Sequence, residues 1–510
     1  MTTAVVIGAG AAGLATSALL AREGYEVTVV ERLGSHGGRA GNETVQGFRF
    51  DTGPSWYLMP DAFDHFFALF GKRTEDVLDL KPLTPAYRLF PENHDPIDVE
   101  SGRDNAIRLF NSIEPGAGAQ LASYLDRAAE TYDLALRYFL YTTFSTLKPF
   151  AKIRGQYGKL LRYLVEPLDR FVAGQFKDTR LRQMLTYPAV FLSSHPARTP
   201  SMYHLMSHTD LTQGVLYPQG GFAAVMDALY ELALEQGVKF RFNADVASIT
   251  YSGGRATGIS LIDDTLIPAD LTISCADLHH TETRLLPPKL RTYDESWFSR
   301  RDPGLGTVLV MLGVKGKIPE LAHHNLLFSE DWDDDFATVF EGKPAARPLG
   351  ASQSIYVSKP SATDPGVAPE GDENLFVLVP VAAEETIGHG NMYRDGASPQ
   401  VDLIANAAIA QIEKWCGVEG LGERVVVKQT LGPADFRDRY HAWSGGAIGP
   451  AHTLKQSAFL RGANASKKLG ALYYAGATTV PGVGVPMCLI SAENVLKRLR
   501  GDKSPGPLSA

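Results

Sequence analysis

The chain has 510 residues, 44% of them hydrophobic, and a formal net charge of −8. This length exceeds one ordinary core, so two or three domains are expected. The acidic balance, without a concentrated basic face, argues against nucleic acid as a partner. The three cysteines, Cys275, Cys416 and Cys488, lack CxxC spacing and no HExxH occurs, so neither a disulfide framework nor a metal site is expected.

The first 41 residues predict a dinucleotide-binding unit. An apolar strand at 4–7 leads into GAGAAG, where Gly8, Gly10 and Gly13 have the fingerprint spacing, and a helix follows. These glycines permit a tight turn, backbone approach to a pyrophosphate, and close packing of helix on strand. A second strand at 25–30 ends at Glu31, whose carboxylate would accept hydrogen bonds from ribose hydroxyls. The predicted ligands are Gly8, Ala9, Gly10, Ala12, Gly13, Leu14, Glu31 and Arg32.

Two further segments distinguish FAD from NAD. RLGSHGGRAG contains Gly38 and Arg39, and GFRFDTGPS, at 47–55, follows soon after. Here the chain resembles the glutathione-reductase-type flavoproteins of the amine oxidase and phytoene desaturase group, in which the GGR segment lies along the FAD pyrophosphate. The resemblance implies FAD contacts from Gly38, Arg39, Gly53, Pro54 and Ser55. On the residues alone, a surface turn with a solvated arginine is the alternative.

Residues 137–176 interleave aromatic and basic side chains. They include Tyr138, Phe139, Phe144, Phe150 and Tyr163 among Lys148, Lys152, Arg154, Lys159 and Arg162. This pattern is typical of an interfacial helix, and a helix packed on the protein's own core fits it equally well. No apolar run approaches the 18 residues needed to span a bilayer. The first strand begins almost at Met1, leaving no room for a signal peptide, so a cytoplasmic location is expected.

Motifs in the middle of the chain continue the resemblance. YPQGG, at 217–221, matches the family's YPxGG element before a helix, and Val246 occupies the position of a backbone contact to adenine. The segment 273–281 matches a strand end that the family usually writes with Asn where this chain has Cys275, so a side-chain role there is in doubt.

The C-terminal motif follows a strand at 472–475. GATTVPGVGVPM, at 476–487, precedes an apolar helix, whose positive N-terminus would stabilise negative charge on a reduced flavin. The motif closely resembles the C-terminal signature of bacterial and fungal phytoene desaturases. It implies FAD contacts from Gly476, Ala477, Gly484, Val485, Pro486 and Met487; a helix cap beside a loop is the alternative.

Together these motifs imply an α/β fold: a discontinuous, glutathione-reductase-type, Rossmann-like FAD-binding domain with an inserted α+β substrate domain and a helical membrane-associated region. The FAD-binding domain is expected at 1–65, 215–285 and 445–510. A mainly helical insert is expected at 66–214 and a β-rich insert at 286–444.

The resemblance implies an FAD-dependent carotenoid desaturase acting on phytoene or a related carotenoid at the cytoplasmic face of a membrane. Hydride would pass to FAD and a neighbouring proton would leave; the cation is delocalised, so no strong base is needed and no catalytic residue is nominated. Asp51 and Arg39 suit ligand or structural roles equally well. Tunnel walls are expected from Met202, Tyr203 and Met206, although such side chains are more often plain core.

Several alternatives remain open at this point. A flavin amine oxidase, a carotene isomerase and a prenyl-binding carrier such as the Rab GDP-dissociation inhibitors share parts of the pattern. No second strand–GxGxxG–helix unit occurs, so oxygen or a membrane quinone is expected as electron acceptor. The number of desaturation steps, the carotenoid and the oligomeric state do not follow from the sequence.

Overall fold

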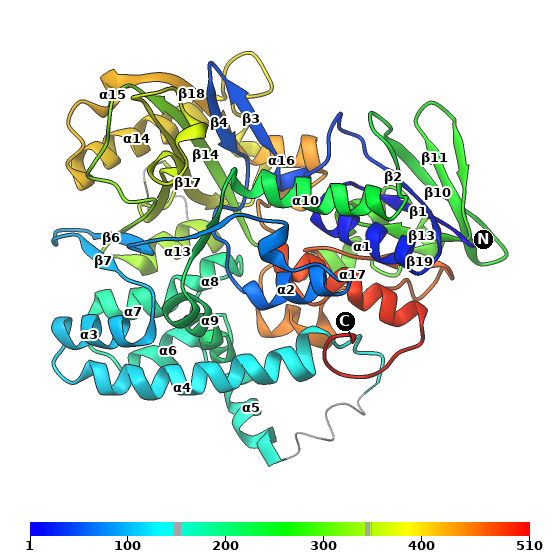
Figure 1. Ribbon diagram of the computed structural model, residues 1–510, viewed down its shortest axis with the longest axis horizontal. Coiled ribbons are helices and arrows are strands. Elements are labelled where there is room, and N and C mark those ends of the chain that lie inside the picture. Colours follow the sequence, from blue (N-terminus) through cyan, green and yellow to red (C-terminus); the bar gives the residue numbers. More distant parts are fainter. Residues whose placement is uncertain (147–154, 342–346, 348, 510) are drawn as a thin grey trace.

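A parallel sheet forms the first layer of the fold. The computed structural model describes residues 1–146, 155–341, 347 and 349–509 (Figure 1). The strand order in this sheet is β19 (Leu472–Tyr474), β13 (Leu271–Ser274), β1 (Thr3–Ile7), β2 (Glu26–Val30) and β9 (Lys239–Arg241). These strands lie far apart in the sequence, and they place their carboxyl ends along one edge.

Both faces of the parallel sheet are covered. Successive side chains of a strand point to opposite faces. Accordingly, Ala4 and Val6 belong to the core under α1 (Ala11–Arg22), α10 (Gly221–Glu235) and α17 (Val485–Leu499). Val5 and Ile7 pack on the other side, against the antiparallel strands β10 (Val246–Ser252), β11 (Arg255–Leu261) and β12 (Leu266–Pro268).

A large mixed sheet forms the second region. Its order is β18 (Val425–Leu431), β14 (Leu305–Val314), β17 (Glu373–Ala382), β16 (Ile355–Ser358), β15 (His324–Phe328), β6 (Tyr87–Pro91) and β7 (Ile97–Val99). Val308 and Val310 face a core shared with α14 (Pro399–Cys416), whereas Leu309 and Met311 face the helical region. Strands β6 and β7 come from the range expected to be mainly helical, so that insert completes the sheet of the other insert.

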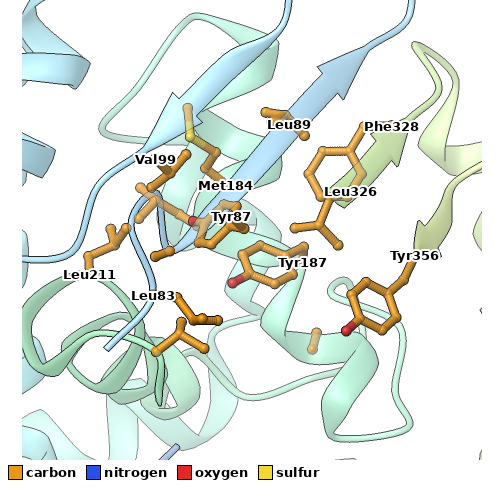
Figure 2. Packing of buried hydrophobic residues seen from close by; sticks show 14 of the residues in the cluster. Leu83, Tyr87, Leu89, Val99, Met184, Tyr187, Leu211, Leu326, Phe328 and Tyr356 are labelled. Atoms are coloured by element: carbon orange, nitrogen blue, oxygen red, sulfur yellow. The ribbon is translucent and has the colours of Figure 1, made fainter. Parts of the chain in front are cut away.

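Helices pack below the mixed sheet in Figure 1. They are α3 (Arg103–Ile113), α4 (Ala117–Ala135), α5 (Tyr157–Val165), α6 (Leu168–Ala173), α7 (Thr179–Thr186), α8 (Pro188–Phe191) and α9 (Met206–His208). Figure 2 shows how they join the sheet: Tyr187 and Met184 pack with Tyr87 of β6 and Phe328 of β15. The hydroxyls of Tyr87 and Tyr187 both donate to Asp210, whose pKa burial raises to about 7.

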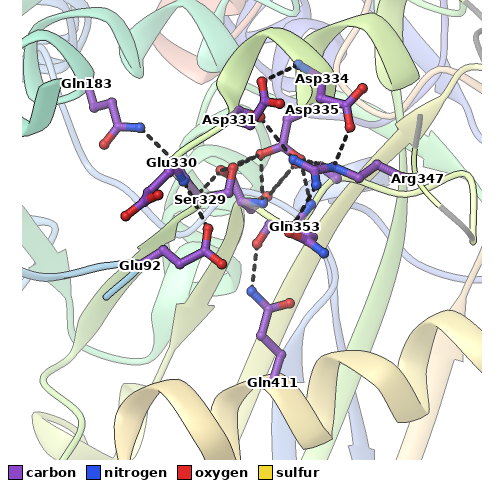
Figure 3. Close-up of polar contacts among 12 residues, drawn as sticks. Glu92, Gln183, Ser329, Glu330, Asp331, Asp334, Asp335, Arg347, Gln353 and Gln411 are labelled. Carbon is purple, nitrogen blue, oxygen red and sulfur yellow. Dashed lines mark hydrogen bonds and ion pairs between the residues drawn. The ribbon is translucent and has the colours of Figure 1, made fainter. Parts of the chain in front are cut away.

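A buried carboxylate fixes the outer end of the mixed sheet (Figure 3). Asp335 on α13 (Trp332–Phe340) accepts hydrogen bonds from the backbone N–H groups of Gln353 at 2.7 Å and Ser354 at 3.1 Å. The guanidinium of Arg347 donates to the same carboxylate at 3.1 Å. The helix and the strand that follows Ser354 are therefore held together by charge-assisted hydrogen bonds.

Shorter elements connect these layers. They are α2 (Pro60–Ala68), β3 (Asn42–Val45), β4 (Phe48–Asp51), β5 (Leu80–Pro82), β8 (Leu216–Pro218), α11 (Leu278–Thr283), α12 (Glu295–Phe298), α15 (Leu421–Arg424) and α16 (Pro433–Tyr440). Among the described residues, no helix is both long and apolar enough to cross a membrane. Four members of the basic and aromatic stretch, Lys148, Phe150, Lys152 and Arg154, lie outside the described residues.

Candidate functional site

One large cavity lies where the two sheets and the helical region meet. Its volume is about 520 Å³. Its walls include Ile7, Val30, Cys275 and Ala475, each at or just beyond the carboxyl end of a parallel strand. Ligands of open α/β sheets bind at this edge. Ligand pockets typically measure roughly 300–1,000 Å³, so this cavity has the size of a site for a large cofactor or ligand.

Two helix N-termini face this cavity. Helices α1 and α17 begin after Gly10 and Gly484, and neither N-cap residue supplies a side-chain cap. The first N–H groups of a helix have no partner within the helix, and they bind phosphates and other anions well. A Cβ on Gly10 would meet nothing nearer than 3.9 Å, so the space above this residue is open.

The glycine-rich segment at 37–39 lies directly against the first turn. The N–H of Gly37 donates to the carbonyl of Ala9 at 2.9 Å, and a Cβ on Gly53 would lie 2.0 Å from the carbonyl oxygen of Arg39. These contacts hold the 37–39 segment between the first turn and Gly53 in the wall of the cavity. The Nε of Arg39 is buried without a hydrogen-bond partner among the described residues, although Arg39 lines the cavity. A buried guanidinium N–H of this kind fits an anionic ligand.

Glu31 is fixed by backbone groups at the end of β2. Its carboxylate accepts hydrogen bonds from the N–H of Ala9 at 2.7 Å and from the N–H of Leu33 at 2.8 Å. A carboxylate has about four acceptor positions, so two remain for a ligand such as ribose hydroxyls. The open space at Gly10, the free helix N-termini, Arg39 and Glu31 together fit the pyrophosphate and ribose groups of FAD.

The cavity brings together most of the residues predicted from the sequence. Those lining it are Gly8, Gly10, Ala12, Glu31, Arg32, Gly38, Arg39, Gly53, Pro54, Ser55, Val246, Gly476, Ala477, Gly484, Val485, Pro486 and Met487. Three predicted ligands lie behind the wall: Ala9, Gly13 and Leu14. A Cβ on Gly13 would lie 1.8 Å from the carbonyl oxygen of Gly8, so this glycine serves close packing, and Leu14 is fully buried in the core.

The predictions for the substrate tunnel and for Asp51 had mixed outcomes. Tyr203 and Met206 line it, whereas Met202 packs against a hydrophobic core cluster instead. Asp51 is not among the lining residues. Its carboxylate accepts the N–H of Phe222 at 2.8 Å, and burial raises its pKa to about 7, so it anchors the turn of the YPxGG element.

The mixed sheet and the helical region supply an apolar wall. It is formed by Leu309, Leu378, Phe376, Tyr356, Phe191, Leu192, Leu205 and Leu140. Leu205 lies between the predicted Tyr203 and Met206, and Leu140 lies in the basic and aromatic stretch at 137–176, but the other positions have no motif around them. Alternation along β17 indicated which side chains share a face, but not which face would border a cavity, because that depends on the packing of distant segments.

A pair of histidines also escaped the sequence analysis. His280 and His441 stack with ring centroids 3.8 Å apart and planes inclined by 1°, and both line the cavity beside Arg32. Burial, then the charge of His441, lowers the pKa of His280 to about 3. Burial also raises the pKa of Cys275 to about 12. The imidazole of His280 and the thiol of Cys275 are therefore neutral at pH 7, so His280 is not a cationic acid and Cys275 is not a thiolate nucleophile. No cluster that could hold a metal ion occurs in the described ranges.

Comparison with known proteins gives a consistent result over the whole chain. The model of the family described as flavin containing amine oxidoreductase matches residues 11–498. The chain is 38% identical to a carotenoid 3,4-desaturase of Haloarcula japonica, over 98% of each chain. It is 32% identical to a zeta-carotene-forming phytoene desaturase of Myxococcus xanthus, over 97% of this chain and 93% of that one.

Solved structures share the fold at much lower identity. An oxidoreductase from Methanosarcina mazei superposes with a TM-score of 0.63 at 18% identity, covering 97% of this chain and all of that one. At this identity the likeness concerns the fold alone.

Proposed function

This chain belongs to the family of flavin-containing amine oxidoreductases, and on that premise we propose that it is an FAD-dependent carotenoid desaturase. The observation that carries the proposal is the single cavity that joins a dinucleotide-binding edge to a long apolar wall. The full-length relatives named as carotenoid and phytoene desaturases support it. The reaction removes one hydride and one neighbouring proton from the polyene, and a new carbon–carbon double bond forms between the two carbons.

FAD, when bound, supplies the hydride acceptor. We assign its binding to the cavity-lining residues predicted from the sequence, within a cofactor domain built from residues 1–65, 215–285 and 445–510. The N–H groups at the start of α1 and the guanidinium of Arg39 would neutralise the pyrophosphate, and the carboxylate of Glu31 would accept hydrogen bonds from the ribose hydroxyls. The N-terminus of α17 presents positive charge to the cavity where Val485 and Met487 line it.

The apolar wall binds the hydrocarbon substrate. Leu309, Phe376 and Leu378 offer no hydrogen bond to a ligand, so a hydrocarbon chain is held by burial of its surface. The same wall excludes water from the reacting carbons. The histidines and thiols of the cavity are neutral, which agrees with a proton that leaves an already acidic carbon without a strong base.

Product analysis tests this function and separates its alternatives. The purified protein loaded with FAD is incubated with phytoene in liposomes, and the carotenoid is extracted and weighed by mass spectrometry. A desaturase lowers the mass by two hydrogens for each new double bond. An unchanged mass with a shifted absorption spectrum would instead show a carotene isomerase. An unchanged spectrum with bound carotenoid would point to a carrier.

We also propose that α5 attaches the protein to a membrane surface. Leu160 and Tyr163 of this helix are buried, while Leu161 and Val165 lie exposed one turn apart. An exposed apolar stripe beside basic side chains such as Arg162 is typical of a helix that lies in the headgroup region. A second exposed apolar group is formed by Leu454, Phe459 and Leu460. The location we propose is the cytoplasmic face of a membrane, where an apolar substrate is available.

A charge substitution on α5 tests this attachment. Leu161→Glu combined with Val165→Glu should reduce binding to anionic liposomes at least tenfold in a co-sedimentation assay, because two apolar side chains that would be buried in the bilayer, at ~1.5 kcal/mol or more each, are lost. The double change Leu266→Glu and Ile262→Glu, at two exposed apolar side chains near β12, serves as the matched control. An equal loss of liposome binding in both double variants, or no loss of binding in either, would contradict the assignment of α5.

The electron acceptor is proposed to be oxygen or a membrane quinone. The glycine-containing segment between α14 and α15, at 417–420, is a turn that joins two helices and follows no strand. It therefore lacks the strand–turn–helix arrangement of a nicotinamide site. Reoxidation of the protein by NAD or NADP in the absence of oxygen and quinone would contradict this proposal.

A further inference from the structure

His452 holds the loop that leads into α17. Residues 481–484 of this loop include Pro481, Val483 and Gly484, which line the cavity. The N–H of Val483 donates to Nε2 of His452 at 3.2 Å. A Cβ on Gly482 would lie 2.2 Å from Cε1 of the same ring, so the imidazole rests on the glycine backbone. The histidine, which also lines the cavity, therefore holds the loop through a hydrogen bond and a direct packing contact.

The hydrogen bonds around His452 define its tautomer. Since Nε2 accepts from a backbone N–H, the ring proton lies on Nδ1, which donates to the hydroxyl oxygen of Tyr203 at 2.7 Å. Tyr203 in turn donates to Ser457 at 3.3 Å, and Ser457 donates to the carbonyl of Thr453 at 2.9 Å. Each group in this series donates to the next one, so every hydrogen bond from the 481–484 loop to the 453–457 segment has one donor and one acceptor.

This arrangement excludes a role for His452 as a general base. Both ring nitrogens have partners, and burial, helped by the charge of Arg461, lowers the pKa of His452 well below its ordinary value. The backbone of His452 is held as well, because its N–H donates to the carbonyl of Leu192 at 3.2 Å. The ring is therefore a fixed, neutral support for the 481–484 loop at the wall of the cavity.

We propose that His452 is a positioning residue that fixes the 481–484 loop, and with it the N-terminus of α17, so as to raise the reduction potential of the bound flavin. The N-terminus of a helix stabilises nearby negative charge, and the effect falls off within the first turn. A reduced flavin carries more negative charge than an oxidised one. A displacement of this loop therefore weakens the preference for the reduced form. The inference concerns the flavin alone, so it does not depend on which substrate the protein oxidises.

Two conservative variants separate the two hydrogen bonds of His452. In His452→Gln the amide oxygen can take the place of Nε2 and still accept from Val483. In His452→Asn the amide nitrogen can take the place of Nδ1 and still donate to Tyr203, but the side chain does not reach the loop. We expect the potential of His452→Gln to stay near that of the wild-type protein. His452→Asn should favour the oxidised flavin about tenfold more, which for a two-electron couple corresponds to a fall of about 30 mV.

The potential is measured on the FAD-bound protein by anaerobic spectrophotometric titration with a reference dye. The difference in reduction potential between His452→Asn and the wild-type protein should be constant from pH 6 to pH 9, because the imidazole of the wild-type protein is neutral over this range. His204→Gln is the matched control. His204 is a buried histidine whose Nδ1 bonds the carbonyl of Ser201 at 2.7 Å, and it does not line the cavity. That variant should lose stability without changing the potential.

A second perturbation covers the case in which His452→Asn does not fold. Gly482→Ala should press on the imidazole and lower the potential in the same direction, with His452 itself intact. Equal potentials in His452→Asn, His452→Gln and wild type would overturn the proposal. An equal fall of the potential in His452→Asn and His452→Gln would overturn it as well, and so would a fall of the same size in His204→Gln. Because the reading is the potential of the flavin, loss of desaturase activity alone neither supports nor contradicts it.

Discussion

Gly10→Val should abolish FAD binding while the protein remains folded. Gly10 has φ −78° and ψ −178°, an extended conformation that valine adopts without strain, and its Cβ position is clear of protein atoms to 3.9 Å. The valine methyls extend into the cavity above α1. Two charge-assisted hydrogen bonds to a pyrophosphate, at roughly 1.5 kcal/mol each, would be lost, so FAD affinity should fall at least about 100-fold. The measurement is fluorescence titration of the apoprotein with FAD.

Gly13→Val is the matched comparison for this prediction. It adds the same methyl groups one helical turn later, but its Cβ would lie 1.8 Å from the carbonyl oxygen of Gly8. This variant should therefore unfold or fail to accumulate, because helix α1 cannot move away without opening the core. A Gly10→Val protein that retains normal yellow flavin absorbance would contradict the assignment of the pyrophosphate site.

Leu378→Trp should block desaturation without loss of FAD. Leu378 lies on β17, lines the cavity and is remote in sequence from the glycine-rich motifs. The larger indole narrows the apolar part of the cavity, and overpacking of a filled site costs about 1–3 kcal/mol. We expect turnover of phytoene to fall at least tenfold, while the flavin spectrum and its affinity stay those of the wild-type protein.

The control for Leu378→Trp lies on the same sheet. Val426 of β18 is exposed, so Val426→Trp adds the same indole outside the cavity and should leave turnover unchanged. If Leu378→Trp turned over phytoene at the wild-type rate, the mixed sheet would not be the substrate wall. If it lost FAD as well, the cofactor would extend further into the cavity than we propose.

The cofactor edge was predictable from the sequence because its parts are local. The tight turn at Gly8 to Gly13, the carboxylate at Glu31 and the glycine-rich loop before α17 each need particular residues at fixed spacing. Strand β1, which leads into the first turn, is a near-continuous apolar run, as a strand buried on both faces should be. Only Ala9, Gly13 and Leu14 lie behind the wall, and their places follow from the same local geometry.

The substrate wall was not predictable from the sequence in the same way. Leu309, Phe376 and Tyr356 carry no motif, and they reach the cavity only because separate inserts fold against each other. Strands β6 and β7 were missed for a related reason: β6 pairs with β15, more than 200 residues away in sequence, and β7 joins the sheet only through β6, so local periodicity contains no sign of the sheet that they complete. The stacked pair of His280 and His441 depends equally on a long-range contact.

The central claim, that one cavity couples bound FAD to oxidation of a polyene, is tested most directly by an anaerobic visible spectrum. The FAD-loaded protein is mixed with phytoene-containing liposomes, and flavin and polyene absorption are followed together. We predict that the visible absorbance of the oxidised flavin falls while new polyene bands appear at a matching rate and at longer wavelength than those of phytoene. Flavin that stays oxidised beside unchanged phytoene, but is bleached by an amine, would contradict the account and identify an amine oxidase.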